Sequence, residues 1–289
     1  MSIVERALKR LQAEATTTRN RPVFGRVVEA PLSSAAPTRV ISIDQDALRM
    51  AGLLAPKHQE REIASQYRQI KRPLLAAAMG KGQEHVASER LIMVASALPG
   101  EGKTFTAINL AFSMAFEKDL QVVLVDGDVA KPQISKMFGV STEKGLLDAV
   151  TDPAVQLETL ILPTDVSNLS LLPAGTHSDH ATELLASERM HEAMRWLLQR
   201  DGRRIFVFDS PPLLLSAEAP ALAEIAGQIV VVVRAEHTEH HVVLAALQRL
   251  PEGSAPSLVL NQSTARGGTY YYYGYGAAEG SAATKDGGS

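Results

Sequence analysis

Short, continuously apolar runs recur through the middle of the chain, and segments with a helical spacing of apolar residues separate them. Runs of this kind predict strands that are buried on both faces of a parallel sheet. The predicted strands are Leu91–Ala95, Gln121–Val125, Leu169–Leu172, Ile205–Phe208, Ile229–Val233 and Ser257–Leu260. Predicted helices between them include Thr104–Phe116 and Ala181–Gln199. This alternation predicts an α/β fold, doubly wound around a mostly parallel sheet.

The pattern changes towards the N-terminus. Residues 2–15 place their apolar side chains on one face of a short amphipathic helix, which either packs on its own domain or docks on a partner or a lipid surface. Residues 16–38 are rich in Thr, Pro, Ser and Ala and have no steady period, which is typical of a linker. Residues 44–79 are predicted to be helical, with breaks at Pro56 and Pro73.

At the other end, Gly, Ser, Ala and Thr dominate from Gln262 onward, which is typical of a flexible tail. The chain is therefore divided into three parts. We expect an N-terminal amphipathic helix and linker at residues 1–43, one main α/β domain at 44–262, and a tyrosine-rich tail at 263–289.

Composition narrows the classes of function. The formal net charge of −3 indicates no general affinity for nucleic acid, and the absence of cysteine excludes disulfide frameworks and cysteine-based metal or redox sites. Charged residues occupy the N-terminal stretch where a secretory signal would be apolar, and no apolar run approaches the roughly 18 residues that span a bilayer. We expect a cytoplasmic protein that reaches the inner face of the membrane only through a partner or a surface contact.

The segment after the first predicted strand has the spacing of a phosphate-binding loop. It reads Ser96-Ala97-Leu98-Pro99-Gly100-Glu101-Gly102-Lys103-Thr104, and a helix follows. Gly100 and Gly102 let backbone N–H groups curl around phosphate oxygens, and the helix N-terminus adds partial positive charge. Lys103 would reach the β- and γ-phosphates, and the Thr104 hydroxyl would bind Mg²⁺.

A strand before the loop and a helix after it favour a P-loop over a chance glycine-rich turn, although Ala97 replaces the first glycine of the general pattern. The sequence therefore predicts ATP and Mg²⁺ as cofactors. The candidate nucleotide contacts in and after the loop are Pro99, Gly100, Glu101, Gly102, Lys103, Thr104 and Phe105.

Three aspartates leave the ends of apolar strands. Asp126 and Asp128 follow one strand, and Asp209 ends another. Because ligands bind beyond the carboxyl ends of strands in open α/β sheets, the three side chains are expected to converge on the phosphate site as a magnesium-binding group. The alternative is that they are helix caps or turn formers.

Tyrosine is concentrated near the C-terminus. Of six tyrosines, five are Tyr270, Tyr271, Tyr272, Tyr273 and Tyr275. This block is either a low-complexity, adhesive tail or a set of phosphoryl acceptors beside an ATP site. An extended chain from Asn261 to Tyr270 spans on the order of 30 Å, enough to reach a neighbouring subunit. The sixth tyrosine, Tyr67, is expected to pack within the N-terminal helical region.

With these motifs, the chain resembles the bacterial tyrosine autokinases of the exopolysaccharide type, in particular the subgroup found with exosortase loci. The resemblance runs from about residue 44 to Tyr275. It implies a SIMIBI-type P-loop ATPase fold related to the MinD and ParA group, preceded by a helical region. It also implies an ATP-dependent protein-tyrosine kinase that phosphorylates the tyrosines of its own tail between subunits of a ring.

The resemblance assigns roles to single residues. Asp126 matches a candidate base or water-mediated magnesium ligand, Asp128 a residue that aligns the tyrosine hydroxyl, and Asp209 a magnesium ligand. Asn261, at the end of the last predicted strand, matches an adenine contact, although a polar strand terminator is an equal alternative. The implied partners are further copies of the chain, a membrane protein that sets polysaccharide chain length, and a tyrosine phosphatase.

The chain departs from this family in its subunit-contact motif. The family's Glu-x-x-Arg-x-x-Arg helix corresponds to Ser65, Arg68 and Lys71, so two cations remain as candidate oligomer contacts and the glutamate is missing. In addition, Ala130 stands where the family commonly has an arginine after the acidic motif. The ring contact is therefore less well supported by the sequence than ATP binding.

Two other functions fit the same motifs. A ParA- or MinD-like ATPase switch would use nucleotide to control dimerisation, but such proteins usually carry a second lysine at the position that is Leu98 here. A non-enzymatic scaffold of an export machine would bind nucleotide without chemistry. The tyrosine block argues against the switch, and the intact lysine and aspartates argue against the scaffold.

Overall fold

The computed structural model describes residues 40–80 and 87–264, and every structural statement below refers to this part of the chain. The predicted amphipathic helix and nearly all of the linker lie outside the described residues, and so do the five tail tyrosines. The predictions for those segments remain predictions.

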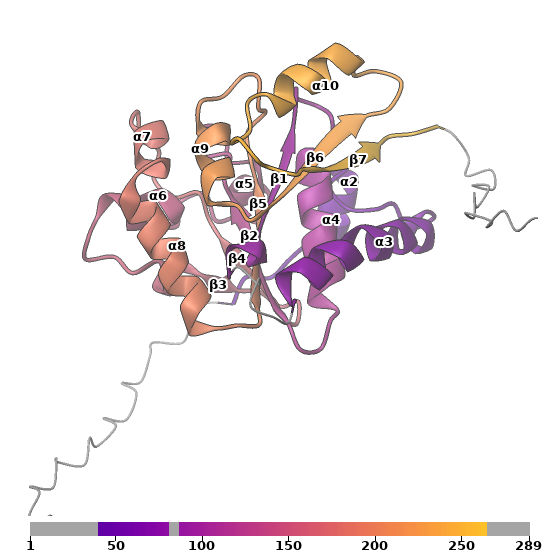
Figure 1. Ribbon diagram of the computed structural model, residues 1–289. Helices are drawn as coiled ribbons and strands as arrows, with labels where there is room; N and C mark the ends of the chain where they lie inside the picture. The colour runs from indigo at the N-terminus through magenta and orange to yellow at the C-terminus, as the bar shows by residue number, and fades with distance from the viewer. Residues whose placement is uncertain (1–39, 81–86, 265–289) are drawn as a thin grey trace, which may run out of the picture. The chain divides into compact units, whose positions relative to one another are not determined.

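A seven-stranded sheet forms the centre of the described domain (Figure 1). The strands lie in the order β3-β4-β2-β5-β1-β6-β7, and only the β3–β4 pair is antiparallel. The strand bounds are β1 Leu91–Ser96, β2 Gln121–Asp126, β3 Leu162–Pro163, β4 Leu169–Leu172, β5 Arg204–Asp209, β6 Gln228–Arg234 and β7 Ser257–Asn261. The predicted fold class is confirmed, and each of the six predicted strands agrees with the structure to within one residue at either end.

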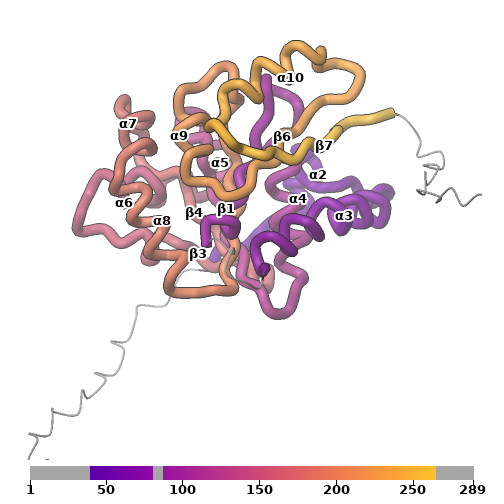
Figure 2. Tube along the Cα trace, in the orientation of Figure 1, coloured from indigo at the N-terminus to yellow at the C-terminus, as the bar shows by residue number. Residues whose placement is uncertain are grey.

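Helices cover both faces of this sheet. One face carries α2 Gln45–Met50, α3 Glu60–Ala78, α4 Lys103–Ala115 and α5 Gln133–Met137. The opposite face carries α6 Leu146–Thr151, α7 Ala181–Leu185, α8 Glu188–Arg200, α9 Glu218–Ile225 and α10 His240–Leu247. Two short 3-10 helices, η1 Ala87–Arg90 and η2 Leu157–Leu160, complete the described elements. Figure 2 shows α3, early in the chain, beside β7 at its end, and both elements line one cavity.

The central strand β1 shows why the strands are apolar throughout. Leu91, Met93 and Ala95 pack into the core under α6 to α10, while Ile92 and Val94 pack into the core under α2 to α5. Successive side chains point to opposite faces of a strand, so a strand covered on both faces has no polar alternation. Because β1 is fixed by packing on both faces, the loop that follows it is held in place at the carboxyl end of the strand.

Two local predictions need correction, and one strand was missed. Helix α3 runs through Pro73 without ending there, because the helix is held by buried residues on both sides of the proline, among them Tyr67 and Leu74. The single helix predicted at residues 181–199 is two helices, since the hydroxyl of Ser187 accepts a hydrogen bond from the Met190 N–H and starts α8. The short antiparallel strand β3 was not predicted.

The start of the described chain also packs on the domain. Ile41 and Ile43, which the sequence analysis assigned to the linker, are buried. The Ile41 N–H donates to the Pro163 carbonyl at 2.8 Å, and the Ile43 N–H donates to the Asp165 carboxylate at 3.0 Å. These bonds attach the segment to the β3–β4 edge of the sheet.

Candidate nucleotide site

The predicted phosphate-binding loop joins β1 to α4. Gly100 and Gly102 both have left-handed backbone conformations, with φ of 82° and 97°, and Gly102 caps the N-terminus of α4. Side chains disfavour this conformation, so glycine suits both positions. A Cβ atom at Gly102 would also lie 2.0 Å from Nδ2 of Asn261. The loop is thus shaped by left-handed glycines and closed on one side by the end of β7.

The side chain of Glu101 stabilises the loop. Its carboxylate is almost completely buried and accepts hydrogen bonds from the Leu98 N–H at 2.7 Å and from the Thr238 hydroxyl. The side chain therefore holds the loop closed and ties it to the segment after β6. Only the backbone of Glu101 remains to contact a phosphate.

The three strand-end aspartates do converge. Asp126 and Asp209 are register partners on the neighbouring strands β2 and β5, and both are fully buried. The Asp126 Oδ2 atom accepts hydrogen bonds from the N–H and the hydroxyl of Ser135 at 2.6 and 2.7 Å. Asp128 lies two residues beyond Asp126, and it lines the cavity over the loop.

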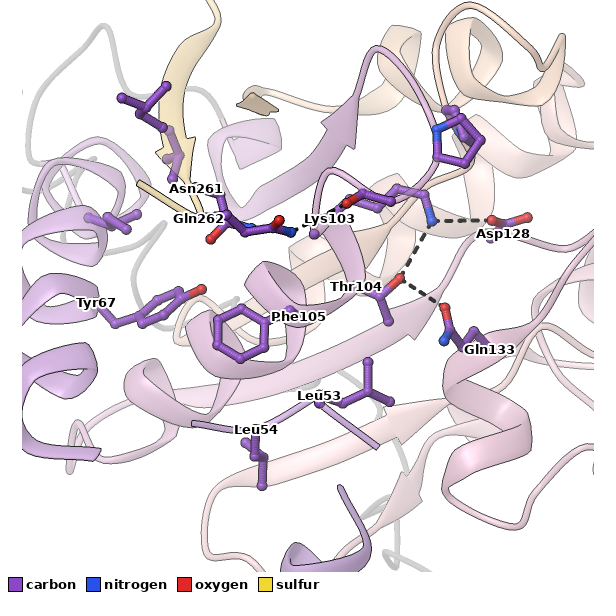
Figure 3. Close-up of a pocket in the computed structure, with 18 of the residues that line it drawn as sticks. Leu53, Leu54, Tyr67, Lys103, Thr104, Phe105, Asp128, Gln133, Asn261 and Gln262 are labelled. Atoms are coloured by element: carbon purple, nitrogen blue, oxygen red, sulfur yellow. Dashed lines mark hydrogen bonds and ion pairs between the residues drawn. The ribbon is translucent and has the colours of Figure 1, made fainter. Parts of the chain in front are cut away.

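Lys103 lies between two of these carboxylates. Its Nζ atom is 3.4 Å from Asp128 Oδ2 and 4.0 Å from Asp209 Oδ1, and it is 3.5 Å from the Thr104 hydroxyl. Figure 3 shows Lys103 beside Asp128 and Thr104, and the Thr104 hydroxyl also lies 3.5 Å from Gln133 Oε1. A cation in this position can exchange a carboxylate for a phosphate when a nucleotide enters.

Burial leaves the acidic pair poised to bind a cation. Both oxygens of Asp209 and Oδ1 of Asp126 are buried without a well-formed hydrogen bond. Burial raises the pKa of Asp126 to about 6, and it raises the pKa of Asp209 to about 7 against the opposing effects of Lys103 and the Thr104 hydroxyl. Oxygen ligands and a compensating divalent charge would satisfy these atoms, so the residues fit Mg²⁺.

A cavity of about 1380 Å³ opens over this group. Besides the loop and Asp128, it is lined by Tyr67 of α3, Phe105 of α4 and Asn261 of β7 (Figure 3). Asn261 Nδ2 donates to the Glu101 carbonyl at 2.8 Å, so its amide lies directly on the loop. Tyr67 is buried with its ring centroid 6.4 Å from that of Phe105, which confirms that Tyr67 packs within the helical region.

The two candidate oligomer contacts, Arg68 and Lys71, differ in their exposure to solvent. Arg68 is exposed on α3 and stays a prediction. Lys71 is buried, and its ammonium group donates to the Ser113 carbonyl at 2.6 Å and pairs with the Glu117 carboxylate at 2.8 Å. Lys71 therefore joins α3 to the end of α4 inside the chain. Its predicted role as a subunit contact stays a prediction.

Sequence reasoning missed several residues that support the site. Gln133 and Ser135 follow the acidic motif at the start of α5, where they reach Thr104 and Asp126. Thr238 anchors Glu101, and the Gln262 amide approaches the Gly100 carbonyl at 3.4 Å. The polar start of a helix directly after the acidic motif was an available signal for the first two, but nothing in the sequence indicated the contacts from residues 238 and 262.

The parallel sheet, the strand–loop–helix unit and the converging aspartates define a P-loop nucleotide-binding protein. Residues 87–234, just over half of the chain, match the ParA family, described as "NUBPL iron-transfer P-loop NTPase". The chain belongs to this family of P-loop NTPases.

Several similar proteins are named tyrosine-protein kinases. The chain is 28% identical to the tyrosine-protein kinase Wzc of Salmonella typhimurium over 65% of its length, and 29% identical to YwqD of Bacillus subtilis over 73%. The kinase domain of Escherichia coli Etk superposes with a TM-score of 0.61 at 25% identity, covering 73% of this chain and 80% of that domain. The VpsO kinase domain gives a TM-score of 0.58 at 28% identity, covering 71% of this chain and 98% of that domain.

The extent of these matches differs between relatives. The aligned part is 86% of YwqD but only 26% of Wzc, so the chain spans about a quarter of the longer relative. Within residues 40–80 and 87–264, no helix is both long and apolar enough to cross a membrane.

Proposed function

We propose that this chain is an ATP-dependent protein-tyrosine kinase whose substrates are the tyrosines of its own C-terminal segment, presented by a neighbouring copy. The observation that carries the proposal is the meeting of Lys103 with Asp128 and Asp209 over a P-loop, in a chain that also carries a block of five tyrosines at residues 270–275. The similarity to proteins named tyrosine-protein kinases supports the same activity.

In the proposed reaction, the phenol oxygen of a tail tyrosine attacks the γ-phosphorus of ATP. The new O–P bond forms as the bond to the β,γ-bridging oxygen breaks, and ADP leaves. Lys103 and the N–H groups of the loop would hold the β- and γ-phosphates, and Thr104, Asp126 and Asp209 would hold Mg²⁺. When bound, Mg²⁺ would neutralise charge on the phosphate oxygens.

Asp128 is the best placed of the three aspartates to receive the phenol proton. Its side chain lines the cavity, whereas Asp126 and Asp209 are fully buried, and Asp126 is held by Ser135. A phenol has a pKa of about 10 and must lose its proton during transfer. Most of the rate acceleration should nevertheless come from positioning and charge neutralisation.

The finer biological setting is also part of the proposal. We infer a homo-oligomer in which Arg68 contributes a subunit contact, regulated by a membrane protein that determines polysaccharide chain length and reversed by a tyrosine phosphatase. Recruitment to the inner face of the membrane would then depend on that partner. The setting rests on the resemblance to exopolysaccharide autokinases, whereas the proposed chemistry rests on the geometry.

A ParA-type ATPase switch is a second candidate, favoured by the family match over residues 87–234. In that case nucleotide hydrolysis would control association, and the tail would not be a substrate. Leu98, at the position of the second lysine expected in such switches, has its N–H bonded to Glu101, and it offers no charge to a phosphate.

One experiment separates these functions. The purified full chain is incubated with Mg²⁺ and ATP and probed with an anti-phosphotyrosine antibody, beside Lys103→Met and a variant with all five tail tyrosines replaced by alanine. The kinase predicts a signal that is lost in both variants. ATP hydrolysis without phosphotyrosine would establish the switch, and nucleotide binding with neither activity would leave a scaffold.

A further inference from the structure

Strand β7 is an unprotected edge of the sheet. It pairs with β6 on one side, and no described strand pairs with its other side. Its sequence, Ser257–Asn261, contains neither a charge nor a proline, and the side chains of Leu258 and Leu260 are 57% and 64% exposed. Natural edge strands usually carry lysine, proline or a bulge that prevents pairing with another chain. An apolar edge without these features is suited to receive a further strand.

The backbone of β7 is oriented for such an addition. The Ala235 N–H at the end of β6 donates to the Asn261 carbonyl at 2.8 Å, so the backbone groups of Asn261 point towards β6. Backbone direction alternates along a strand, so the N–H and C=O groups of Leu258 and Leu260 point outward. These four groups are the ones that an added strand would bind.

The open edge and the phosphate site share one cavity. Leu258 and Leu260 line the same 1380 Å³ space as Lys103 and Asp128, and residues of α3 line it as well. Pockets for a single small molecule typically measure about 300–1,000 Å³, so this space is large enough for a nucleotide together with part of a peptide. A strand laid along β7 would therefore have one end beside the P-loop.

The chain itself contains a segment that matches this edge. Thr269 is followed by four tyrosines, Gly274 and Tyr275, and the segment has no charged residue. Threonine and tyrosine favour strands, and a strand would direct alternate tyrosines to opposite faces. Tyrosines on one face would cover Leu258 and Leu260, in the way that aromatic and aliphatic side chains pair across strands.

The proposed function decides which copy supplies the segment, because it has the tail of one copy presented to the site of its neighbour. The last described residue, Thr264, donates its hydroxyl to the Glu236 carboxylate at 2.8 Å, just beyond the end of β6. The segment 269–275 begins five residues further along the chain. We propose that residues 269–275 of a second copy bind the outer edge of β7 as an added strand and so deliver a tyrosine to the nucleotide site. This inference rests on the proposed kinase function and adds how the acceptor is recognised.

Strand addition also explains how the phosphorylated segment would dissociate from β7. A phosphate adds roughly −1.5 to −2 charges to a tyrosine. Such a side chain would lie against uncharged leucines or near Asp128, and both surroundings disfavour it. A modified segment should leave the edge and expose it to the next acceptor.

Disulfide trapping tests the added strand without relying on catalysis, because the chain has no native cysteine. One copy carries Leu258→Cys, and the other carries cysteine at one of positions 270, 271, 272 or 273. After oxidation with copper phenanthroline, we expect cross-linked dimers at alternate tail positions, since strand side chains repeat every two residues. Leu244→Cys is the matched control, because Leu244 is 47% exposed on α10 and lies outside the cavity.

Three outcomes of the trapping would overturn the inference. Cross-linking no stronger than with Leu244→Cys means that the edge is not the binding site. Equal cross-linking at all four tail positions means random encounter rather than a strand. A cross-linked monomer formed by one chain carrying both cysteines means that the chain's own tail occupies the edge.

Kinetics test the consequence for catalysis. The donor is the full chain with its tail tyrosines replaced by alanine, and the acceptor is the full chain with Lys103→Met. Adding Leu258→Lys and Leu260→Lys to the donor should raise the KM for the acceptor about tenfold with kcat unchanged, because lysine on an edge opposes pairing. Leu244→Lys should leave both constants unchanged. An unchanged KM in the double variant contradicts strand addition, whereas no transfer by the unsubstituted donor contradicts the kinase function and leaves the trapping result to decide the edge.

Discussion

Asp126 and Asp209 lie side by side as register partners at the carboxyl ends of β2 and β5, and both carboxylates are fully buried. Burial is the main cause that raises the pKa of both groups, and the charge of Asp126 raises the pKa of Asp209 further. Close to neutral pH the nucleotide-free site therefore retains protons that a magnesium–nucleotide complex must displace. The pair links phosphate binding to pH.

The affinity for MgATP should rise with pH. Magnesium binds the ionised carboxylates, and these are protonated below a pKa of about 6 for Asp126 and about 7 for Asp209. Between about pH 5.5 and 8, affinity should increase by up to about tenfold per pH unit for each proton released, and then level off. Calorimetry at pH 6.5 in buffers of different ionisation enthalpy should detect proton release. Proton uptake, or an affinity that does not change with pH, would contradict the arrangement.

Asp209→Asn should stabilise the nucleotide-free protein at pH 8. The folded-state pKa of about 7 lies above the unfolded value of about 4, so the carboxyl group favours folding at low pH and loses that contribution as pH rises through 7. We expect Asp209→Asn to raise the free energy of unfolding by on the order of 1–3 kcal/mol at pH 8 and by roughly a third of that amount at pH 5. Urea titration measures both values, and the exposed Asp119→Asn serves as the control. A loss of stability in Asp209→Asn at pH 8 would contradict the claim that burial of the ionised Asp209 carboxylate destabilises the folded protein.

The two loop glycines should respond differently to alanine. Both have positive φ, but a Cβ at Gly100 meets no atom within 4 Å, whereas one at Gly102 lies 2.0 Å from Asn261 Nδ2. Gly100→Ala should cost about 1 kcal/mol of stability through backbone strain alone. Gly102→Ala should cost more, and Asn261→Ala should restore part of the difference. Equal costs in thermal unfolding, or no rescue by the second change, would mean that Asn261 does not close the loop.

Lys71 and Arg68 should give opposite phenotypes. Lys71→Met removes a buried hydrogen bond and leaves Glu117 without its ion partner, so it should cost on the order of 1–3 kcal/mol of stability. Arg68→Ala removes an exposed side chain and should leave stability unchanged while it weakens self-association. Denaturant unfolding and sedimentation of both variants make the comparison. If Lys71→Met folds fully but self-associates more weakly, Lys71 also contributes to the contact between subunits.

The sheet and its phosphate loop were predictable because their signals are local. Each central strand is buried on both faces, so its apolar run is easily recognised in the sequence. Gly100, Gly102 and Lys103 have the spacing that a phosphate-binding loop requires. The convergence of Asp126 and Asp209 followed from one rule about strand ends. No tertiary information was needed for these features.

The remaining features depend on contacts between distant parts of the chain. Whether Lys71 faces solvent or Glu117 is decided by how α3 packs on α4, and a motif on α3 alone cannot indicate this. Glu101 is turned inward by Thr238, which lies 137 residues away along the chain. Helix α3 passes Pro73 because burial of its apolar face outweighs one missing hydrogen bond.

Mass spectrometry of the intact full chain after incubation with MgATP tests the central claim most directly. The account predicts phosphate on tyrosines among residues 270–275, none in Lys103→Met incubated alone, and recovery when Lys103→Met is mixed with a donor lacking tail tyrosines. A folded protein that binds MgATP but gains no phosphate on any of these tyrosines, alone or mixed, would contradict it.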